Sequence, residues 1–436
     1  MGKIFEIRDP IHGFVTLNEW ERDIINHPVF QRLRRIRQLG LTDMVYPGSM
    51  HTRFEHSLGV MQVATRMFNH IKERRSDFLK SELHFNDDGL RRDKVLVRLS
   101  CLLHDVGHAP FSHAAEGLMD KDQLSGKSYK HEQYSAAAVD FLMQDVIENH
   151  PLNQNYHIKA KEIADFLNGD SSVGRSLLWR DLVSGQLDAD RADYLLRDSH
   201  HIGVAYGYYD LNRLIATLTV AIEPDNDSPV IAVEEGGEHA AEALIIARYM
   251  MFTQVYFQHT RRAYDYHSIE SIKALLAKSK VQAGKEVFPA PTSKENVEEY
   301  LKWDDWKVLG LISAGEAGKN GKIMMERKHH RAVFETPETP RAEDQEFAKE
   351  IQDALGSKVA FVDFASGSWY KFEAADVPFL LQPGHTDEQL TTLSTISSVV
   401  KGLTTVNRTR IYVPMGKKDE ARETVAKKRK EREEKR

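Results

Sequence analysis

The stretch KVLVRLSCLLHDVGHAPFSH, residues 94–113, joins an apolar helix to a group of side chains that can bind metal. Its apolar residues recur at intervals of three and four, which predicts a buried helix that ends near Gly107. His104 and Asp105 stand at the end of this helix, so we expect both inside the protein. Buried polar groups need partners, and a divalent cation would satisfy both. His108 follows His104 by four residues, so the two share one face while the helix continues.

Two further segments carry residues of the same chemistry. HTRFEHSLGV spans residues 51–60, and LDADRADYLLRDSHH spans residues 187–201. An adjacent histidine and aspartate alone are weak evidence for a metal site, but their combination with these two segments indicates a metal centre. A set of two imidazoles and two carboxylates leaves open positions in an octahedral shell. Such a set suits Mn²⁺, Fe²⁺, Mg²⁺ or Zn²⁺ and supports Lewis-acid catalysis.

Composition excludes several classes of protein. The chain has 436 residues, which is enough for more than one hydrophobic core, and a net charge of −6, which argues against a general nucleic-acid binder. No apolar run approaches the roughly 18–20 residues that span a bilayer, so we expect no membrane association. The single cysteine, Cys101, excludes a disulfide framework and fits a reducing compartment, so we expect a cytoplasmic protein.

The periodicity along the chain predicts a mainly α fold, with a helical core and a smaller C-terminal α+β lobe. We expect short extended runs at 4–7 and 14–17, a local strand at 229–233, and β-rich runs at 307–313, 322–335, 358–364 and 410–414. Four parts follow: an extended segment at 1–20, a helical catalytic domain at 21–289, an α+β accessory lobe at 290–415 and a charged tail, helical or disordered, at 416–436. The sequence contains no internal repeat.

Taken together, the motifs resemble those of the HD-domain deoxynucleoside triphosphate triphosphohydrolases. The likeness runs from DPIHG at Asp9, through HTRFEHSLGV, HDVGHAPFSHAAEG and DADRADYLLRDSHHIG, to RRAYDYH at His267. Bacterial members and the catalytic core of the vertebrate antiviral member are the most similar. The resemblance implies a largely helical HD-domain fold, a homotetramer, and hydrolysis of a deoxynucleoside triphosphate to a deoxynucleoside and inorganic triphosphate.

The same resemblance assigns roles to individual residues around the metal. It implies that the divalent ion is held by His56, His104, Asp105 and Asp190. It places His108 and His131 near the scissile phosphate, with Glu116 orienting His131. A histidine oriented in this way by a carboxylate is suited to donate a proton to the leaving group.

The resemblance also implies a substrate-binding set. It assigns Arg53 and Arg191 to the phosphates, Tyr194 and Asp198 to the sugar 3′-hydroxyl, Gln38 and Leu39 to the deoxyribose, and Tyr264 to the opposite side of the sugar. An apolar side chain pressed against C2′ leaves a 2′-hydroxyl without room or a partner, which would select deoxynucleotides.

Some positions depart from the family pattern. Asp265 stands where the vertebrate member has an amide near the base, and a carboxylate only accepts hydrogen bonds, which favours amines and N–H groups. Tyr256 replaces an arginine that contacts phosphate. Gln31 and Arg34 match a site for an activating nucleotide, but Asn26 replaces an aspartate that reads guanine there. We therefore expect nucleotide-dependent assembly with an altered effector.

Two other functions compete with this interpretation. An HD phosphohydrolase acting on a monophosphate, a cyclic nucleotide or an alarmone would use the same ligands. RQLG, DYLLRD and RRAYDYH favour the triphosphohydrolase, because they face the sugar and phosphates rather than the metal. A regulatory HD protein that binds nucleotides or nucleic acid is the second alternative. Its intact ligands and negative charge argue against it, although the KKRK run in the tail could contact phosphates.

Overall fold

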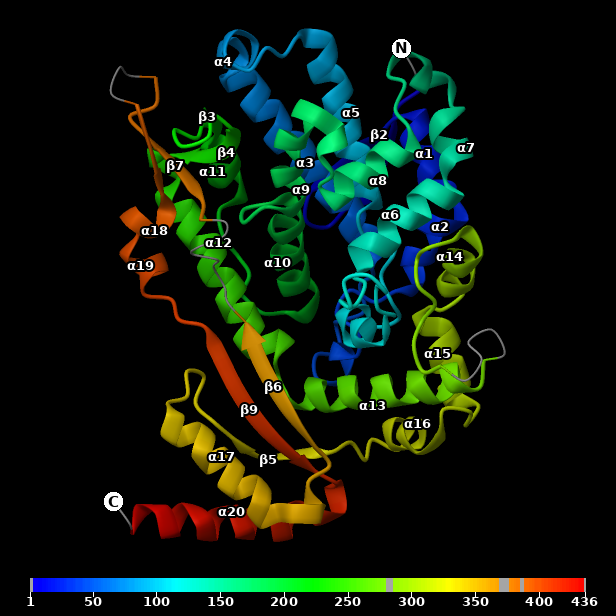
Figure 1. The fold of residues 1–436 in the computed structure, drawn as a ribbon, viewed down its shortest axis with the longest axis vertical. Helices are drawn as coiled ribbons and strands as arrows, with labels where there is room; N and C mark the ends of the chain where they lie inside the picture. The colour runs from blue at the N-terminus through cyan, green and yellow to red at the C-terminus, as the bar shows by residue number, and fades with distance from the viewer. Residues whose placement is uncertain (1–2, 280–284, 368–375, 385–387, 435–436) are drawn as a thin grey trace.

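The computed structural model describes residues 3–279, 285–367, 376–384 and 388–434. Helices dominate this part of the chain, and its C-terminal part adds strands (Figure 1). The prediction of a mainly α fold with a smaller α+β lobe is therefore confirmed. Residues 1–2 of the predicted extended segment and 435–436 of the predicted tail lie outside the described residues. Among those described, no helix combines the length and apolar character needed to cross a bilayer.

Three helices position the metal-binding segments: α3 (Arg53–Arg74), α5 (Asp87–Leu103) and α10 (Ala189–Ile202). Helix α3 packs against both of the others. It begins with a capping box, in which the side chains of Thr52 and Glu55 satisfy free backbone N–H groups of the first turn. Helix α5 follows the predicted apolar stretch and ends at Leu103, directly before His104. The sequence-predicted placement of the histidine and aspartate at a buried helix end is thus observed.

The remaining helices of the core surround these three. They are α1 (Glu19–Asn26), α2 (Pro28–Gln31), α4 (Ser76–Ser81), α6 (His131–Leu142), α7 (Gln144–Glu148), α8 (Ala160–Asn168), α9 (Asp181–Ser184), α11 (Leu211–Ala216), α12 (Glu238–Met251) and α13 (His259–Ala277). The chain enters the core through an antiparallel hairpin of β1 (Phe5–Asp9) and β2 (Gly13–Leu17). This hairpin confirms the two predicted extended runs. Its turn ends at Gly13, whose φ of 77° favours glycine.

A four-stranded sheet lies beside the core in the order β3-β4-β7-β8. Its strands are β3 (Leu218–Ile222), β4 (Pro229–Glu234), β7 (Pro378–Leu381) and β8 (Gln389–Thr392), followed by α18 (Leu393–Ile396) and α19 (Ser398–Lys401). The predicted strand at 229–233 is confirmed as β4. Strand β3 was not predicted, because its run LTVAI continues directly from α11 without a turn residue. Pairing with β4 over five residues decides its conformation.

Residues 294–325 form three helices rather than the β-rich run expected at 307–313. They are α14 (Lys294–Leu301), α15 (Asp305–Ser313) and α16 (Gly318–Met325). The prediction of a strand for the KVLGLIS run is wrong, because Asp304 caps a helix there by accepting a hydrogen bond from the Lys307 backbone N–H. Val308 and Ile312, four residues apart, then face one core. This core also contains Tyr134 of α6, so helices on both sides of residue 290 share it, and the proposed domain division at 290 stays a prediction.

The C-terminal lobe is a three-stranded sheet packed against two helices (Figure 1). It contains β5 (Arg331–Glu335), β6 (Phe361–Gly367), β9 (Val406–Val413), α17 (Ala342–Leu355) and α20 (Lys418–Glu433), with sheet order β5-β9-β6. The β-rich runs expected at 358–364 and 410–414 are confirmed as strands, and 322–335 is divided between α16 and β5. The charged tail is helical. It buries Ala421 and Val425 and leaves most of its charged residues exposed.

A buried ion network joins the N-terminal hairpin to α10. Arg197 is fully buried, and its guanidinium donates to both carboxylate oxygens of Asp193 and to Asp9, each at 2.8 Å. Asp193 also accepts from His12 at 2.6 Å and from Nδ1 of His56 at 2.8 Å. The network therefore holds one expected metal ligand in place.

Replacing Arg197 by methionine is expected to lower the free energy of unfolding by about 3–5 kcal/mol, because two buried carboxylates lose their counter-charge. Chemical denaturation measures this loss. The control is Arg91→Met, whose side chain is exposed and pairs only with exposed Asp88, so its unfolding curve should stay near the wild type. Equal stability of the two variants would contradict the structural role of the network.

Candidate metal centre and adjoining cavity

The four residues expected to bind metal come together at one point. Nε2 of His56 lies 3.0 Å from Oδ1 of Asp190 and 3.5 Å from Oδ2 of Asp105. Nε2 of His104 lies 3.3 Å from Oδ1 of Asp105 and 3.8 Å from Oδ1 of Asp190. The fold thus brings ligand atoms from α3, α10 and the end of α5 within reach of one ion.

Hydrogen bonds through Nδ1 direct Nε2 of both histidines toward this point. Nδ1 of His56 pairs with Asp193, and Nδ1 of His104 lies 2.6 Å from the Cys101 carbonyl oxygen. When a metal ion is bound, such a bond fixes the tautomer in which Nε2 carries the lone pair. Nε2 of His104 is buried and has no hydrogen-bond partner among the described residues. A divalent cation would satisfy this orphaned nitrogen, so the residues present fit such an ion.

The electrostatics of the centre favour a positive charge. Burial raises the pKa of Asp105, but the charge of Arg53 and neighbouring histidines outweighs it and holds the pKa well below the usual value. Burial lowers the pKa of His56, but hydrogen bonds to Asp190 and Asp193 outweigh it and raise the pKa to about 10. The carboxylates are therefore ionised, and in the metal-free protein a proton on His56 partly compensates them. A bound cation would take over that role.

A second group of histidines lies next to the metal ligands. The rings of His108 and His131 stack with their centres 3.8 Å apart. Oε1 of Glu116 lies 2.5 Å from Nδ1 of His131 and 2.9 Å from Nδ1 of His113. The expected pairing of His131 with Glu116 is thus present in the geometry. His113 shares the same carboxylate, although the sequence assigned it no role.

The two stacked histidines differ in charge state. Burial, with the charges of Arg53 and His131, lowers the pKa of His108 well below its usual value, so its imidazole is neutral. Burial also lowers the pKa of His131, but the hydrogen bond and charge of Glu116 outweigh it and raise the pKa. One neutral and one more basic imidazole therefore lie side by side, and the more basic one, His131, is suited to act as a general acid.

A cavity of about 660 Å³ adjoins these groups. Of the residues expected at the substrate, it is lined by Gln38, Leu39, Arg53, Tyr194, Asp198 and Asp265. Arg53 connects this cavity to the metal centre, since its Nη1 donates to Asp105 at 2.5 Å and its Nε to Ser112 at 2.8 Å. Asp198 accepts from the hydroxyl of Tyr256 at 2.6 Å. Tyr256, which departs from the family pattern, therefore orients the Asp198 carboxylate in the cavity wall.

Part of the cavity wall was not expected from the sequence. Arg261 and Arg262 of α13 and Phe361 and Asp363 of β6 also line it. Arg262 donates to Asp363 at 2.5 Å, which ties α13 to the C-terminal lobe. The RRAYDYH motif gave a signal for the two arginines, but nothing in the local pattern of 358–364 indicated that this strand reaches the cavity.

Comparison with known proteins defines the family. The HD domain matches residues 53–198, and the HD associated region matches residues 209–432, about half of the chain. The chain belongs to the HD-domain family that carries an HD associated region. HD domains are typical of metal-dependent hydrolases, and the described residues include histidines and aspartates that could hold a metal ion.

The relatives differ in how much of their length the chain covers. The uncharacterized protein MJ1154 of Methanocaldococcus jannaschii is 37% identical over 59% of this chain and 47% of its own. The uncharacterized protein YwfO of Bacillus subtilis is 29% identical over 95% of this chain and 93% of its own length. Deoxynucleoside triphosphate triphosphohydrolase SAMHD1 of Gallus gallus is 28% identical over 82% of this chain and 60% of its own length. The chain thus spans less than two thirds of MJ1154 and of this SAMHD1.

A solved structure matches almost the whole chain. The crystal structure of a hypothetical protein from Aquifex aeolicus has a TM-score of 0.75 and 28% sequence identity, and it covers 97% of this chain and 100% of its own. The HD domain and the associated region are therefore arranged here much as in that protein.

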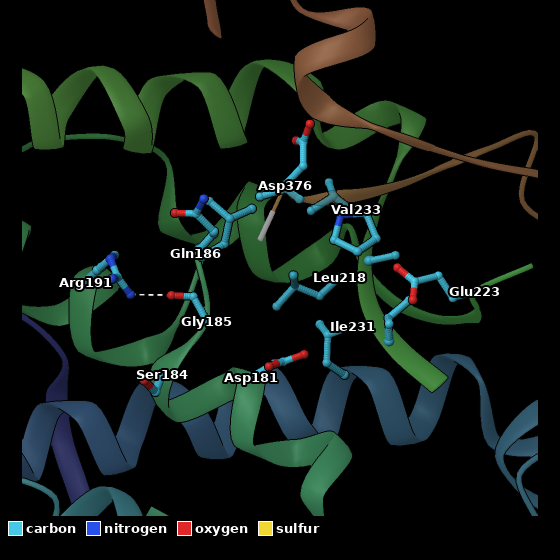
Figure 2. A pocket seen from close by; sticks show the side chains of 15 residues that line it. Asp181, Ser184, Gly185, Gln186, Arg191, Leu218, Glu223, Ile231, Val233 and Asp376 are labelled. Carbon is cyan, nitrogen blue, oxygen red and sulfur yellow. Dashed lines mark hydrogen bonds between the residues drawn. The ribbon is translucent and has the colours of Figure 1, made fainter. Parts of the chain in front are cut away.

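Two residues expected at the substrate, Arg191 and Tyr264, do not line the cavity of about 660 Å³. The guanidinium of Arg191 donates to the Asp188 carboxylate and to the Gly185 carbonyl, beside a second cavity of about 310 Å³ (Figure 2). Tyr264 is fully buried, with its ring centre 4.6 Å from that of His329. In this structure neither side chain lines the larger cavity, so their contacts with phosphate and sugar stay predictions.

The residues expected at an effector site lie near one another at the end of α1 and beyond. Asn26 is exposed at the last position of α1. Gln31 donates to the Ile25 carbonyl at 2.7 Å and accepts from Nε of Arg34 at 3.0 Å. The guanidinium of Arg34 also lies over the ring of Phe54, 3.4 Å from its centre. These contacts hold Gln31 and Arg34 beside each other, and the role of all three residues toward a nucleotide stays a prediction.

Proposed function

We propose that this HD-domain hydrolase cleaves deoxynucleoside triphosphates to a deoxynucleoside and inorganic triphosphate. The observation that carries the proposal is the cavity of about 660 Å³ that Arg53 joins to the metal centre, because it combines a nucleotide-sized space with a phosphate-binding cation. The SAMHD1 relatives, whose names state this activity, support it.

The metal would be held by His56, His104, Asp105 and Asp190. When bound, it supplies Lewis-acid chemistry toward a phosphate oxygen. Arg53 adds a fixed positive charge at the same end of the cavity and is already oriented by Asp105 and Ser112. The neutral ring of His108 offers a hydrogen bond to phosphate without adding charge.

His131 would carry the proton that the reaction needs. Cleavage between O5′ and the α-phosphorus leaves an alkoxide, which must be protonated as it departs. Glu116 holds His131 by its Nδ1 and stabilises its protonated form, so Nε2 can donate to O5′. Glu116 acts through His131 and is a positioning residue.

The substrate panel that tests the proposal consists of the four deoxynucleoside triphosphates, with Mn²⁺ or Mg²⁺ and with or without GTP. Ion-exchange chromatography separates the products. Deoxynucleoside with intact triphosphate supports the proposal. Release of phosphate from monophosphates, with every triphosphate left intact, would instead place the chain among HD phosphohydrolases of another substrate class.

Leu39 is expected to exclude ribonucleotides. It is 7% exposed and lines the cavity beside Gln38. Truncating it to alanine should make room for a 2′-hydroxyl and raise the kcat/KM for ribonucleoside triphosphates, relative to the matching deoxynucleotides, by about tenfold. Steady-state kinetics on GTP and dGTP measures the ratio. An unchanged ratio in a variant with wild-type thermal stability would show that Leu39 does not contact the sugar.

We also propose that a nucleotide bound near Asn26, Gln31 and Arg34 promotes assembly into a homotetramer. An asparagine offers one acceptor and one donor, unlike the aspartate that it replaces, so the effector should differ from a guanine nucleotide. Analytical ultracentrifugation with each nucleotide tests this. Sedimentation and activity that are both indifferent to every nucleotide would contradict it.

A further inference from the structure

A carboxylate that makes no hydrogen bond to the described residues lies in the cavity wall. Asp265 of α13 is only 3% exposed, and among the described residues neither of its carboxylate oxygens has a hydrogen-bond partner. A buried charge without hydrogen bonds costs several kcal/mol, so a structure keeps one only where another group supplies the missing bonds. Because Asp265 lines the cavity, that group would be a ligand.

The two arginines nearest to Asp265 pair with it by charge but do not donate a hydrogen bond to its carboxylate. Nη1 of Arg262 lies 3.6 Å from Oδ2, and Nε of Arg261 lies 3.9 Å from the same oxygen, both too far for a hydrogen bond. Arg262 donates through Nε and Nη2 to Asp363, and Arg261 donates to the Tyr256 carbonyl. The Nη1 edge of Arg262 therefore stays beside the carboxylate and can donate to a neighbouring acceptor.

The place of Asp265 in the cavity matches the base of a nucleotide. In the proposed function Arg53 serves the phosphates, and Gln38, Leu39 and Asp198 serve the sugar. The remaining wall is built from α13 and β6, where aromatic rings surround the charged groups: Tyr266 and Phe361 stack with centres 4.1 Å apart. Flat apolar surfaces next to a few fixed polar groups are typical of base recognition.

The geometry points to selection of guanine by Asp265 with Arg262, an inference that rests on the proposed function. A carboxylate presents two acceptors side by side, and guanine is the only one of the four bases with two adjacent donors, N1–H and N2–H. Its O6 acceptor lies next to N1 and would accept from Arg262. In adenine and cytosine an acceptor nitrogen adjoins the amine, and in thymine two carbonyls flank the N–H, so each would face the carboxylate with an acceptor.

The test compares kcat/KM for dGTP, dATP, dCTP, dTTP and dITP, each assayed alone with Mn²⁺ under the same conditions. The base of dITP lacks the 2-amino group and so loses one of the two donors. We expect dGTP to exceed every other substrate, dITP included, by about tenfold or more, the effect of one hydrogen bond to a charged group. This comparison uses the wild-type chain and needs no variant to fold.

Asp265→Asn supplies the matched variant, because asparagine presents one acceptor and one donor. Asp265→Asn should abolish the preference for dGTP over dITP, so that the ratio of their kcat/KM values is about one. The control Glu270→Gln, which removes a carboxylate on the same helix outside the cavity, should retain the preference. Equal use of dGTP and dITP by the wild type, or a preference unchanged in Asp265→Asn, overturns the inference and leaves the proposed function intact. If no deoxynucleoside triphosphate is hydrolysed, the proposed function fails and the inference falls with it.

Discussion

Asp105→Ala is expected to retain no bound metal and to hydrolyse no substrate, while its helix content stays at the wild-type level. The carboxylate oxygens of Asp105 lie beside both histidine ligands, 3.5 Å from Nε2 of His56 and 3.3 Å from Nε2 of His104. The same carboxylate accepts a hydrogen bond from Arg53. Removing it takes away a charged ligand and the group that orients the phosphate-binding arginine. Elemental analysis of the purified variant, circular dichroism and a turnover assay measure the three properties.

The matched control for this variant is Asp88→Ala. Asp88 lies in the exposed first turn of α5, the same helix that leads to the metal centre. Its loss should change neither metal content nor turnover. Substantial residual turnover in Asp105→Ala, with a normal control, would remove the metal centre from the mechanism.

His131→Ala is expected to lower kcat by about 10²–10⁴-fold, the usual contribution of a positioned general acid. Nδ1 of the ring lies 2.5 Å from the Glu116 carboxylate and the ring stacks on His108, so the substitution removes the imidazole that Glu116 orients. Rapid-quench or steady-state assays measure kcat, and metal analysis of the variant checks that the neighbouring ligands are intact. A loss of less than about fivefold at full metal content would contradict the role of His131.

The pH dependence of Glu116→Gln separates positioning from direct catalysis. Glu116 raises the pKa of His131 against the lowering effect of burial. A general acid works in its protonated form, so activity falls as the pH rises through its pKa. Without the carboxylate this basic limb should move to lower pH. The pH profile of kcat in the two proteins tests the sign, and a basic limb that stays in place or moves upward contradicts the pairing.

The sequence predicted the helical core, and the expected metal ligands come together in the fold, because the residues of both lie in recognisable local patterns. The apolar stretch before His104 and the capping residues of α3 determine their helices, and the RFEH and DADR segments carry ligands that the fold brings together. The His131–Glu116 pair was also indicated by the motif in which Glu116 lies. In each case the residues lie in short motifs that can be identified directly in the sequence.

Features that depend on long-range packing were not predicted. The run at 307–313 has a strand-like composition, but a cap at Asp304 and packing against α13 and α6 make it helical. The contribution of β6 to the cavity depends on the bond between Arg262 and Asp363, which lie 101 residues apart. One local feature was also not predicted: Arg191 points toward Asp188, three residues before it, in an ion pair that competes with any phosphate contact.

Hydrolysis of a deoxynucleoside triphosphate in ¹⁸O-labelled water, with Mn²⁺ present, tests the central claim most directly. Mass spectrometry of the products shows which bond breaks and which product receives the solvent oxygen. Attack at the α-phosphorus with departure of O5′ predicts one ¹⁸O atom in intact inorganic triphosphate and none in the deoxynucleoside. Label in the deoxynucleoside, or release of monophosphate or pyrophosphate in place of triphosphate, would contradict the account.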